Sequence, residues 1–175
     1  MRKLHPMSIQ MAYLAMIATV ASFNYLVLFP INDWLTWGAF PYPVAFLITE
    51  LTNKFHGVEK ARRVVFVGFL AAAILSIWLA TPKIAFASAS AFLVAQLLDV
   101  SIFNRLRHQP WWCGIFLAST LASIVDTVIF WSLAFYGEQV PIVTWALGDF
   151  GVKFGLDILM LVPFRLAIRR LVVAT

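Results

Sequence analysis

Residues 111–136 read WWCGIFLASTLASIVDTVIFWSLAFY, and Asp126 is the only charged side chain in this stretch. A helix of about 20 apolar residues is long enough to cross the hydrocarbon core of a bilayer, so these residues predict a transmembrane helix. The whole chain of 175 residues has a similar composition, with 62% hydrophobic and 12% charged residues. Because so few charged side chains cannot cover a soluble globule, the composition predicts an integral membrane protein.

Five other apolar runs have a comparable length, and the six together predict an all-α membrane protein, one bundle of six transmembrane helices. The expected spans are Met7–Phe29, Trp34–Leu51, Val64–Leu79, Ile84–Phe103, Trp111–Tyr136 and Pro141–Leu166. One bundle accommodates all of them, so we expect residues 1–175 to form a single integral membrane transport domain. The first run is longer than the apolar part of a typical signal peptide, about 7–15 residues, which favours an uncleaved first helix.

The second span is interrupted by Pro41 and Pro43. Residues that precede proline are disfavoured in helical geometry. We therefore expect a loop or partial helix over Trp34–Tyr42, followed by a regular helix that starts near Pro43. Two interpretations of the interrupted part remain open. It is either irregular backbone at membrane depth, which must line a cavity or be covered by protein, or an ordinary loop at the outer surface.

The basic residues predict the orientation of the chain in the membrane. The formal net charge is +5, but the basic residues lie in short clusters between apolar runs, which indicates topology signals rather than nucleic-acid binding. Eleven would lie on one face of the membrane: Arg2, Lys3, Lys54, Lys60, Arg62, Arg63, Arg105, Arg107, Arg165, Arg169 and Arg170. Lys83 would lie on the other face. The positive-inside rule therefore predicts that both termini are cytoplasmic.

Ionisable side chains inside the predicted helices indicate a polar site. A charge near the bilayer centre costs roughly 2.5–3.5 kcal/mol on insertion scales, so such residues face a bundle interior, a polar path or a partner. Lys153 is at the middle of the sixth span, with Asp149 and Asp157 one helical turn away on either side. Asp126 has no basic neighbour on its own helix, so its expected partner is Lys153.

Three more polar residues reach a similar depth on other predicted helices, namely Glu50, Gln96 and Asp99. Depth is counted at about 1.5 Å per residue from the middle of each helix. Polar groups from four helices therefore converge, which predicts a site near the membrane midplane. A purely structural interpretation also stays open, because opposite charges on the sixth helix can pair with one another. Glu50 could likewise pair with Lys54 at i+4.

Two aromatic residues accompany these polar groups. Phe46 lies one turn before Glu50, and Phe103 lies one turn after Asp99, so either ring could stack on a flat ligand or pack in the core. Cys113 is the only cysteine, which excludes an intrachain disulfide or a cysteine metal cluster. The three histidines fall in predicted terminal or loop positions. We expect no metal site, no cofactor and no catalytic residue.

Small residues are expected to pack helices against one another. Gly151 and Gly155 form a small-xxx-small pair of the kind that lets two membrane helices approach closely. Ser119 is one turn before Ser123 on the fifth predicted helix, and we assign Ser119 a packing role.

Several of the polar residues belong to longer motifs. These are Phe40-Pro41, residues 46–52 (FLITELT), residues 96–107 (QLLDVSIFNRLR), Ser119-Thr120, residues 126–130 (DTVIF), residues 149–153 (DFGVK) and Pro163. Together they resemble the queuosine precursor transporter family of six-span bacterial inner-membrane proteins. The resemblance extends from about residue 40 to residue 163, and the stretch 96–107 is its most specific part.

The resemblance implies uptake of 7-deazaguanine bases, the 7-cyano and 7-aminomethyl precursors of the tRNA nucleoside queuosine. It also implies kinship with the six-helix substrate-binding subunits of energy-coupling-factor vitamin transporters. A carboxylate can accept adjacent N–H groups of a guanine-like base, and Gln96 or Lys153 can donate to its carbonyl. The expected substrate-binding residues are Glu50, Gln96, Asp99, Asp126, Asp149, Lys153, Phe46 and Phe103.

Two other classes of protein remain as alternatives. An intramembrane aspartyl protease would need two facing aspartates, such as Asp126 and Asp149. However, Ala146 occupies the first glycine position of the Gly-x-Gly-Asp signature. A non-transporting scaffold explains the topology but not so many internal charges, and a substrate-binding subunit of a larger transporter is a related alternative. We expect a transporter and not an enzyme.

The expected partners are the deazaguanine base and the lipid bilayer, with a homodimer left open and no nucleic acid. The chain contains no GxxxxGK[ST] motif, so it cannot hydrolyse a nucleotide by that route. Uptake would then be passive, coupled to protons through a buried carboxylate, or energised by a separate subunit.

Overall fold

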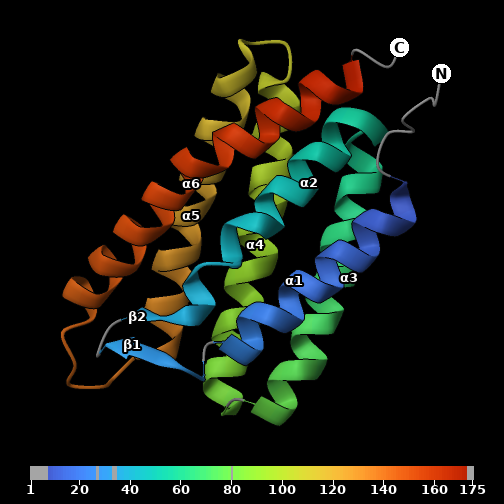
Figure 1. Ribbon diagram of the computed structural model, residues 1–175. Helices are drawn as coiled ribbons and strands as arrows, with labels where there is room; N and C mark the ends of the chain where they lie inside the picture. The colour runs from blue at the N-terminus through green and yellow to red at the C-terminus, as the bar shows by residue number, and fades with distance from the viewer. Residues whose placement is uncertain (1–7, 27, 33–34, 80, 173–175) are drawn as a thin grey trace.

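The computed structural model describes residues 8–26, 28–32, 35–79 and 81–172. This part of the chain is almost entirely helical and forms one bundle (Figure 1). Its elements are α1 (Ile9–Leu26), β1 (Pro30–Asn32), β2 (Leu35–Thr36), the 3₁₀ turn η1 (Trp37–Ala39), α2 (Tyr42–His56), α3 (Val58–Leu79), α4 (Pro82–Leu106), α5 (Trp111–Ala134) and α6 (Ile142–Val172). The six α-helices correspond one for one to the six expected spans. Met7 and Trp34, where two of those spans were expected to begin, lie outside the described residues, as do Arg2 and Lys3.

Four of the helices are long and apolar enough to cross a membrane, namely α1, α3, α4 and α5. By contrast, α2 has only 15 residues. At 1.5 Å per residue it is about 22 Å long, shorter than a hydrocarbon core of about 30 Å. The 31 residues of α6 include Asp149 and Lys153 in its first half and Asp157 at its midpoint. The helices are those of a membrane bundle, whereas a crossing by all six stays a prediction.

The segment before α2 contains the interruption that the prolines predict. Pro41 directly precedes α2, and Pro43 lies in its first turn, where a missing N–H breaks no helical hydrogen bond. The helix begins at Tyr42, so the expected change near Pro43 is confirmed. The bundle is all-α as expected, and β1 and β2 add one short antiparallel pair that the sequence did not indicate. Two strands of three and two residues are too short to leave an alternating pattern in the sequence.

The turn η1 packs against α1, α2 and α6. Its Gly38 is buried, and Figure 1 shows the strands beside the bundle below the start of α2. Irregular backbone within a membrane is tolerated where protein covers it. The contacts of η1 with three helices therefore favour covered backbone over an ordinary surface loop.

The connections that carry most of the basic residues lie at one end of the bundle. In Figure 1 the start of α1, the α2–α3 and α4–α5 connections and the end of α6 are all at the upper end. The α3–α4 and α5–α6 connections are at the opposite end, where Lys83 forms an ion pair with Glu138 at 2.8 Å. This arrangement agrees with the expected grouping of the basic residues on one face.

The interface between α1 and α3 depends on a small residue. A Cβ atom at Gly68 would lie 2.7 Å from Cγ of Met16, too close for any real contact. Gly68 therefore lets the two helices approach around Met16, which is fully buried. The expected packing role of Gly151 and Gly155 is not seen, because a Cβ atom at either would meet nothing within 4 Å in the described chain.

Candidate functional site

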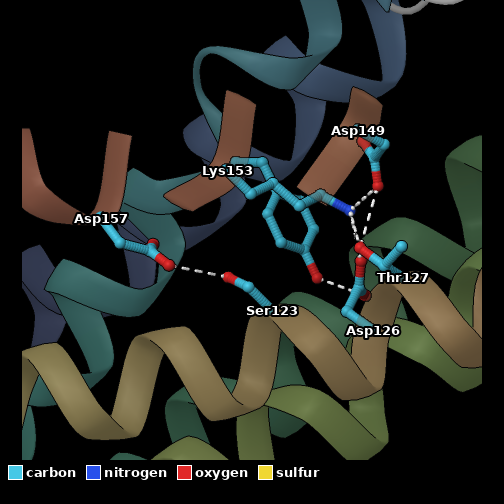
Figure 2. Close-up of polar contacts among 7 residues, drawn as sticks. Ser123, Asp126, Thr127, Asp149, Lys153 and Asp157 are labelled. Atoms are coloured by element: carbon cyan, nitrogen blue, oxygen red, sulfur yellow. Dashed lines mark hydrogen bonds and ion pairs between the residues drawn. The ribbon is translucent and has the colours of Figure 1, made fainter. Parts of the chain in front are cut away.

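Lys153 on α6 is the centre of a buried ion-pair cluster that joins three helices (Figure 2). Its Nζ lies 2.8 Å from Oδ2 of Asp126 on α5 and 2.5 Å from Oδ2 of Asp149 on α6. It also donates to Oγ1 of Thr127 at 3.3 Å, and Thr127 donates to Asp149 at 3.0 Å. The hydroxyl of Tyr42, the first residue of α2, donates to Oδ1 of Asp126. We call these five residues the lysine cluster.

The charged and polar groups of the lysine cluster compensate one another. The Lys153 ammonium has three N–H donors, and it contacts two carboxylates and one hydroxyl. It also lies 5.0 Å from the ring centroid of Tyr42, within the range of a cation–π contact. A buried ion pair offsets its desolvation best when the neighbouring polar atoms are also bonded. Here both oxygens of Asp126 and the hydroxyls of Tyr42 and Thr127 are bonded. The cluster therefore links the first turn of α2 to α5 and α6.

A second buried group consists of Glu50 on α2, Asp99 on α4 and Asp157 on α6, and we call it the acid cluster. All three side chains are at most 1% exposed. Thr49, the neighbour of Glu50 in the sequence, reaches Asp99 with its hydroxyl, and Asp157 lies on α6, which packs against α2. Two hydroxyls serve the cluster: Thr49 lies 3.3 Å from Asp99, and Ser123 donates to Asp157 at 3.0 Å (Figure 2).

Gln96 adjoins the acid cluster from α4. Its Oε1 lies 3.1 Å from the same Thr49 hydroxyl that reaches Asp99. Nε2 of Gln96 and one oxygen each of Glu50, Asp99 and Asp157 are buried with no hydrogen-bond partner among the described residues. Most buried polar atoms in proteins do have partners. Four unpartnered atoms in one region therefore mark a place where a polar ligand would be stabilised.

The two clusters follow one another along the bundle. Asp157 comes one turn after Lys153 on α6, and Glu50 comes two turns after Tyr42 on α2, a rise of about 12 Å. The lysine cluster is thus at the end of α2 that adjoins η1, and the acid cluster is nearer the other end of that helix.

The polar residues expected from the sequence come together in two groups rather than one. The lysine cluster contains Asp126, Asp149 and Lys153, and the acid-cluster region contains Glu50, Gln96 and Asp99. The expected pairing of Asp126 with Lys153 is confirmed. The alternative pairing of Glu50 with Lys54 is wrong, because Nζ of Lys54 donates to the backbone carbonyl of Arg107 at 3.3 Å. The backbone carbonyl of a residue on another helix cannot be foreseen from an i+4 pattern.

The two aromatic candidates have different surroundings. The ring of Phe46 meets the ring of Tyr42 edge-on at 5.5 Å, so Phe46 lies beside the lysine cluster. Phe103 meets Phe164 edge-on at 5.9 Å in an apolar cluster that also contains Ile115. Both rings are buried. Phe46 is therefore placed next to polar groups, whereas Phe103 packs in the core between α4, α5 and α6.

Sequence reasoning left five residues out of the site. They are Tyr42, Thr49, Ser123, Thr127 and Asp157. The spacing of Asp157 from Lys153 was visible, but it suggested pairing with that lysine, whereas its hydrogen bond comes from Ser123. The position of Thr49 directly before Glu50 was the available signal for Thr49. The other hydroxyls donate between helices, and no pattern within one helix indicates such a partner.

The fold and the two clusters define a class of protein, helical membrane proteins with a buried polar site between their helices. The sequence model of the family described as "Putative vitamin uptake transporter" matches residues 36–81 and 76–168, which is most of the chain. The chain belongs to this family of transporters, that of the queuosine precursor transporters.

Curated relatives carry the corresponding name. The "Probable queuosine precursor transporter" of Haemophilus influenzae is 36% identical over 73% of this chain and 66% of the relative. The "Queuosine precursor transporter" of Escherichia coli is 33% identical over 67% of this chain and 64% of the relative. A "Probable queuosine precursor transporter" of Bacillus subtilis is 23% identical over 78% of this chain and 72% of the relative. The chain thus spans slightly less than two thirds of the first two relatives. No solved structure matches it significantly.

Proposed function

We propose that this protein takes up queuosine precursor bases, 7-cyano-7-deazaguanine, 7-aminomethyl-7-deazaguanine or both, across the bacterial cytoplasmic membrane. One observation carries the proposal: buried polar atoms of Glu50, Gln96 and Asp99 have no partner within the described chain. They lie between the helices of a chain whose relatives are named for this substrate. A small polar base would supply the missing hydrogen bonds.

The unpartnered atoms complement the chemistry of a deazaguanine. Such a base offers adjacent N–H donors, which a carboxylate of Glu50 or Asp99 can accept together. Its carbonyl needs a donor, and Nε2 of Gln96 is a buried donor beside those acids. In full, the proposed substrate-binding residues are Glu50, Gln96, Asp99, Asp126, Asp149, Lys153, Phe46 and Phe103. The site would lie near the membrane midplane.

Uptake by the purified protein tests this function. The protein is reconstituted alone in liposomes, and accumulation of a radiolabelled deazaguanine base is followed with time. We expect saturable uptake that unlabelled deazaguanine blocks and adenine does not, because adenine lacks the N1–H and carbonyl of guanine. Binding without transport would instead support a substrate-binding subunit of a larger transporter. Failure to bind either base would contradict the proposal and favour a scaffold.

We also propose that all six helices cross the inner membrane as one domain, with both termini cytoplasmic. The basic residues at one end of the bundle support this orientation. Single-cysteine labelling in a Cys113→Ala background tests it at the α2–α3 connection, where Lys60 is exposed. We expect Lys60→Cys to react with a membrane-impermeant maleimide only after the membrane is permeabilised. Labelling from outside in intact cells would contradict the orientation.

A further inference from the structure

The interior of the bundle carries a large excess of negative charge. Its acidic side chains are Glu50, Asp99, Asp126, Asp149 and Asp157, all buried or nearly so. Lys153 is the one basic side chain that faces them in the part of the chain that the structure describes. Five carboxylates and one ammonium would give a formal charge of −4, which is far too costly in a membrane interior. Positive charge must therefore be supplied from elsewhere.

The excess falls mainly on the acid cluster. Lys153 forms ion pairs with two of the carboxylates, Asp126 and Asp149, and both belong to the lysine cluster. Among the other basic residues on α2, α4 and α6, Lys54 donates to the carbonyl of Arg107, Lys83 pairs with Glu138, and Arg165 lies 4.6 Å from the ring centroid of Trp111. The charged residues of α3 are Glu59, Lys60, Arg62 and Arg63, and all four are exposed. Asp99 and Asp157 are thus left with the hydroxyls of Thr49 and Ser123, and Glu50 keeps a buried oxygen without a partner among the described residues.

We propose that the acid cluster is a cation site that binds protons in the ligand-free protein and exchanges one of them for an ammonium group of the ligand. The proposal rests on the uptake function and deepens it, because it selects the ligand that carries a primary amine. It also makes Asp157 a ligand-binding residue. The unpartnered oxygens of Glu50, Asp99 and Asp157 are the acceptors for the ammonium, and a carboxylate–ammonium pair is stronger than a neutral hydrogen bond.

The exchange balances in charge and protons. When the aminomethyl base enters with its ammonium, one carboxylic acid of the cluster loses its proton to the solvent, and the total charge of the site is unchanged. The cyano base is neutral and brings no such charge, so its binding leaves the protons in place. Binding of the aminomethyl base should therefore become tighter as pH rises, by up to about tenfold per pH unit, while binding of the cyano base should not.

Calorimetric titration of the full chain in lipid nanodiscs tests the proposal. Each base is titrated at pH 6, 7 and 8 in two buffers of different ionisation enthalpy, which gives the dissociation constant and the number of protons released. We expect about one proton released per aminomethyl base and none per cyano base. Equal pH dependence for the two bases, or no proton release, would overturn the cation site. Binding that depends on sodium instead of pH would also overturn it.

If the proposed uptake function is wrong, the titrations give a different result, because neither base then binds at any pH. That result would contradict both proposals. Asp157→Asn supplies a second measurement. This substitution should weaken binding of the aminomethyl base about tenfold and abolish most of the proton release. It should change the dissociation constant of the cyano base less than threefold. Ser119→Ala is the matched control, since Ser119 bonds only to the backbone of its own helix. If Asp157→Asn behaves like Ser119→Ala, the assignment of Asp157 is wrong.

Discussion

The lysine cluster and the acid cluster are both buried and both built on α2 and α6, and they lie one helical turn apart on α6. They differ in how far their charges are compensated by neighbouring groups. In the lysine cluster each charged group touches an opposite charge, and the hydroxyls of Tyr42 and Thr127 are bonded as well. In the acid cluster three carboxylates share two hydroxyls and keep unpartnered oxygens. The first cluster joins three helices, whereas the second keeps buried oxygens that no described residue satisfies.

Buried charge alone therefore does not identify a binding site. A charge that is paired and fully hydrogen-bonded is a structural element whose removal affects folding. A charge whose polar atoms lack partners is where a ligand gains most. The two clusters should therefore respond differently to substitution: a change in the lysine cluster should lower the stability as well as any affinity, whereas a change in the acid cluster should lower mainly the affinity.

The largest effect is expected for Lys153→Met. Removing the ammonium leaves Asp126 and Asp149 buried beside each other without a cation. Breaking a buried pair in this way costs about 3–5 kcal/mol. We expect a free energy of unfolding that is lower by this amount, measured by denaturant titration of the purified protein in mixed micelles. Unchanged stability would show that the lysine cluster does not brace the helices.

A triple substitution sharpens that result. Lys153→Met combined with Asp126→Asn and Asp149→Asn removes the uncompensated charges along with the cation. It should recover most of the lost free energy of unfolding, because a buried ion pair is often neutral relative to uncharged replacements. If the triple variant is as unstable as Lys153→Met, the loss comes from packing of the lysine side chain rather than from charge.

The next prediction compares one carboxylate of each cluster, Glu50 and Asp126. Glu50→Gln keeps the volume of the side chain but removes a charged acceptor that no described residue satisfies. Losing one charge-assisted hydrogen bond should weaken base binding by about 1.5–3 kcal/mol, roughly 10–150-fold. Asp126→Asn should weaken binding similarly and also lower the stability, since Asp126 holds Lys153 and Tyr42. Equilibrium binding and thermal unfolding of both variants provide the comparison.

If both carboxylate variants fold and bind the base like the parent protein, the recognition roles of Glu50 and Asp126 are wrong. If Glu50→Gln lowers only the stability, the acid cluster is structural and the distinction between the two clusters fails.

The sequence predicted the helices well because long apolar runs and basic clusters are local properties. The six runs, the interruption near Pro43 and the pairing of Asp126 with Lys153 could all be read from residue types and spacing. The division of the polar residues into two clusters could not. It depends on how far α2 and α6 are rotated and offset, which is set by contacts between helices.

Asp157 illustrates the limit of such reasoning. Its i+4 distance from Lys153 predicts a pair as strongly as that of Asp149 does. The structure places Asp149 against the lysine, whereas Asp157 points toward Ser123 (Figure 2). The single ammonium is already surrounded by its other partners, and this competition is visible only in three dimensions.

A smaller effect is expected for Tyr42→Phe. The substitution keeps the ring over Lys153 and its contact with Phe46, and it removes only the hydroxyl that donates to Asp126. Hydrogen bonds inside membrane proteins contribute about 0.6 kcal/mol on average and up to about 1.7 kcal/mol. We expect a decrease in the free energy of unfolding in this range with little change in affinity. A large loss of affinity would place Tyr42 in contact with the base.

The smallest effect comes from a pair of serines on α5. Ser119 and Ser123 are four residues apart and both buried, but Ser119 donates to the carbonyl of Ile115 in its own helix, whereas Ser123 donates to Asp157. Ser123→Ala removes a hydrogen bond that holds one oxygen of the acid cluster. We expect a loss of about 0.5–1.5 kcal/mol in binding of the aminomethyl base, roughly 2–13-fold. Ser119→Ala should change it less than twofold, because its hydroxyl touches no group of either cluster. Equal effects of the two substitutions on affinity would mean that Asp157 does not need Ser123 to face the ligand.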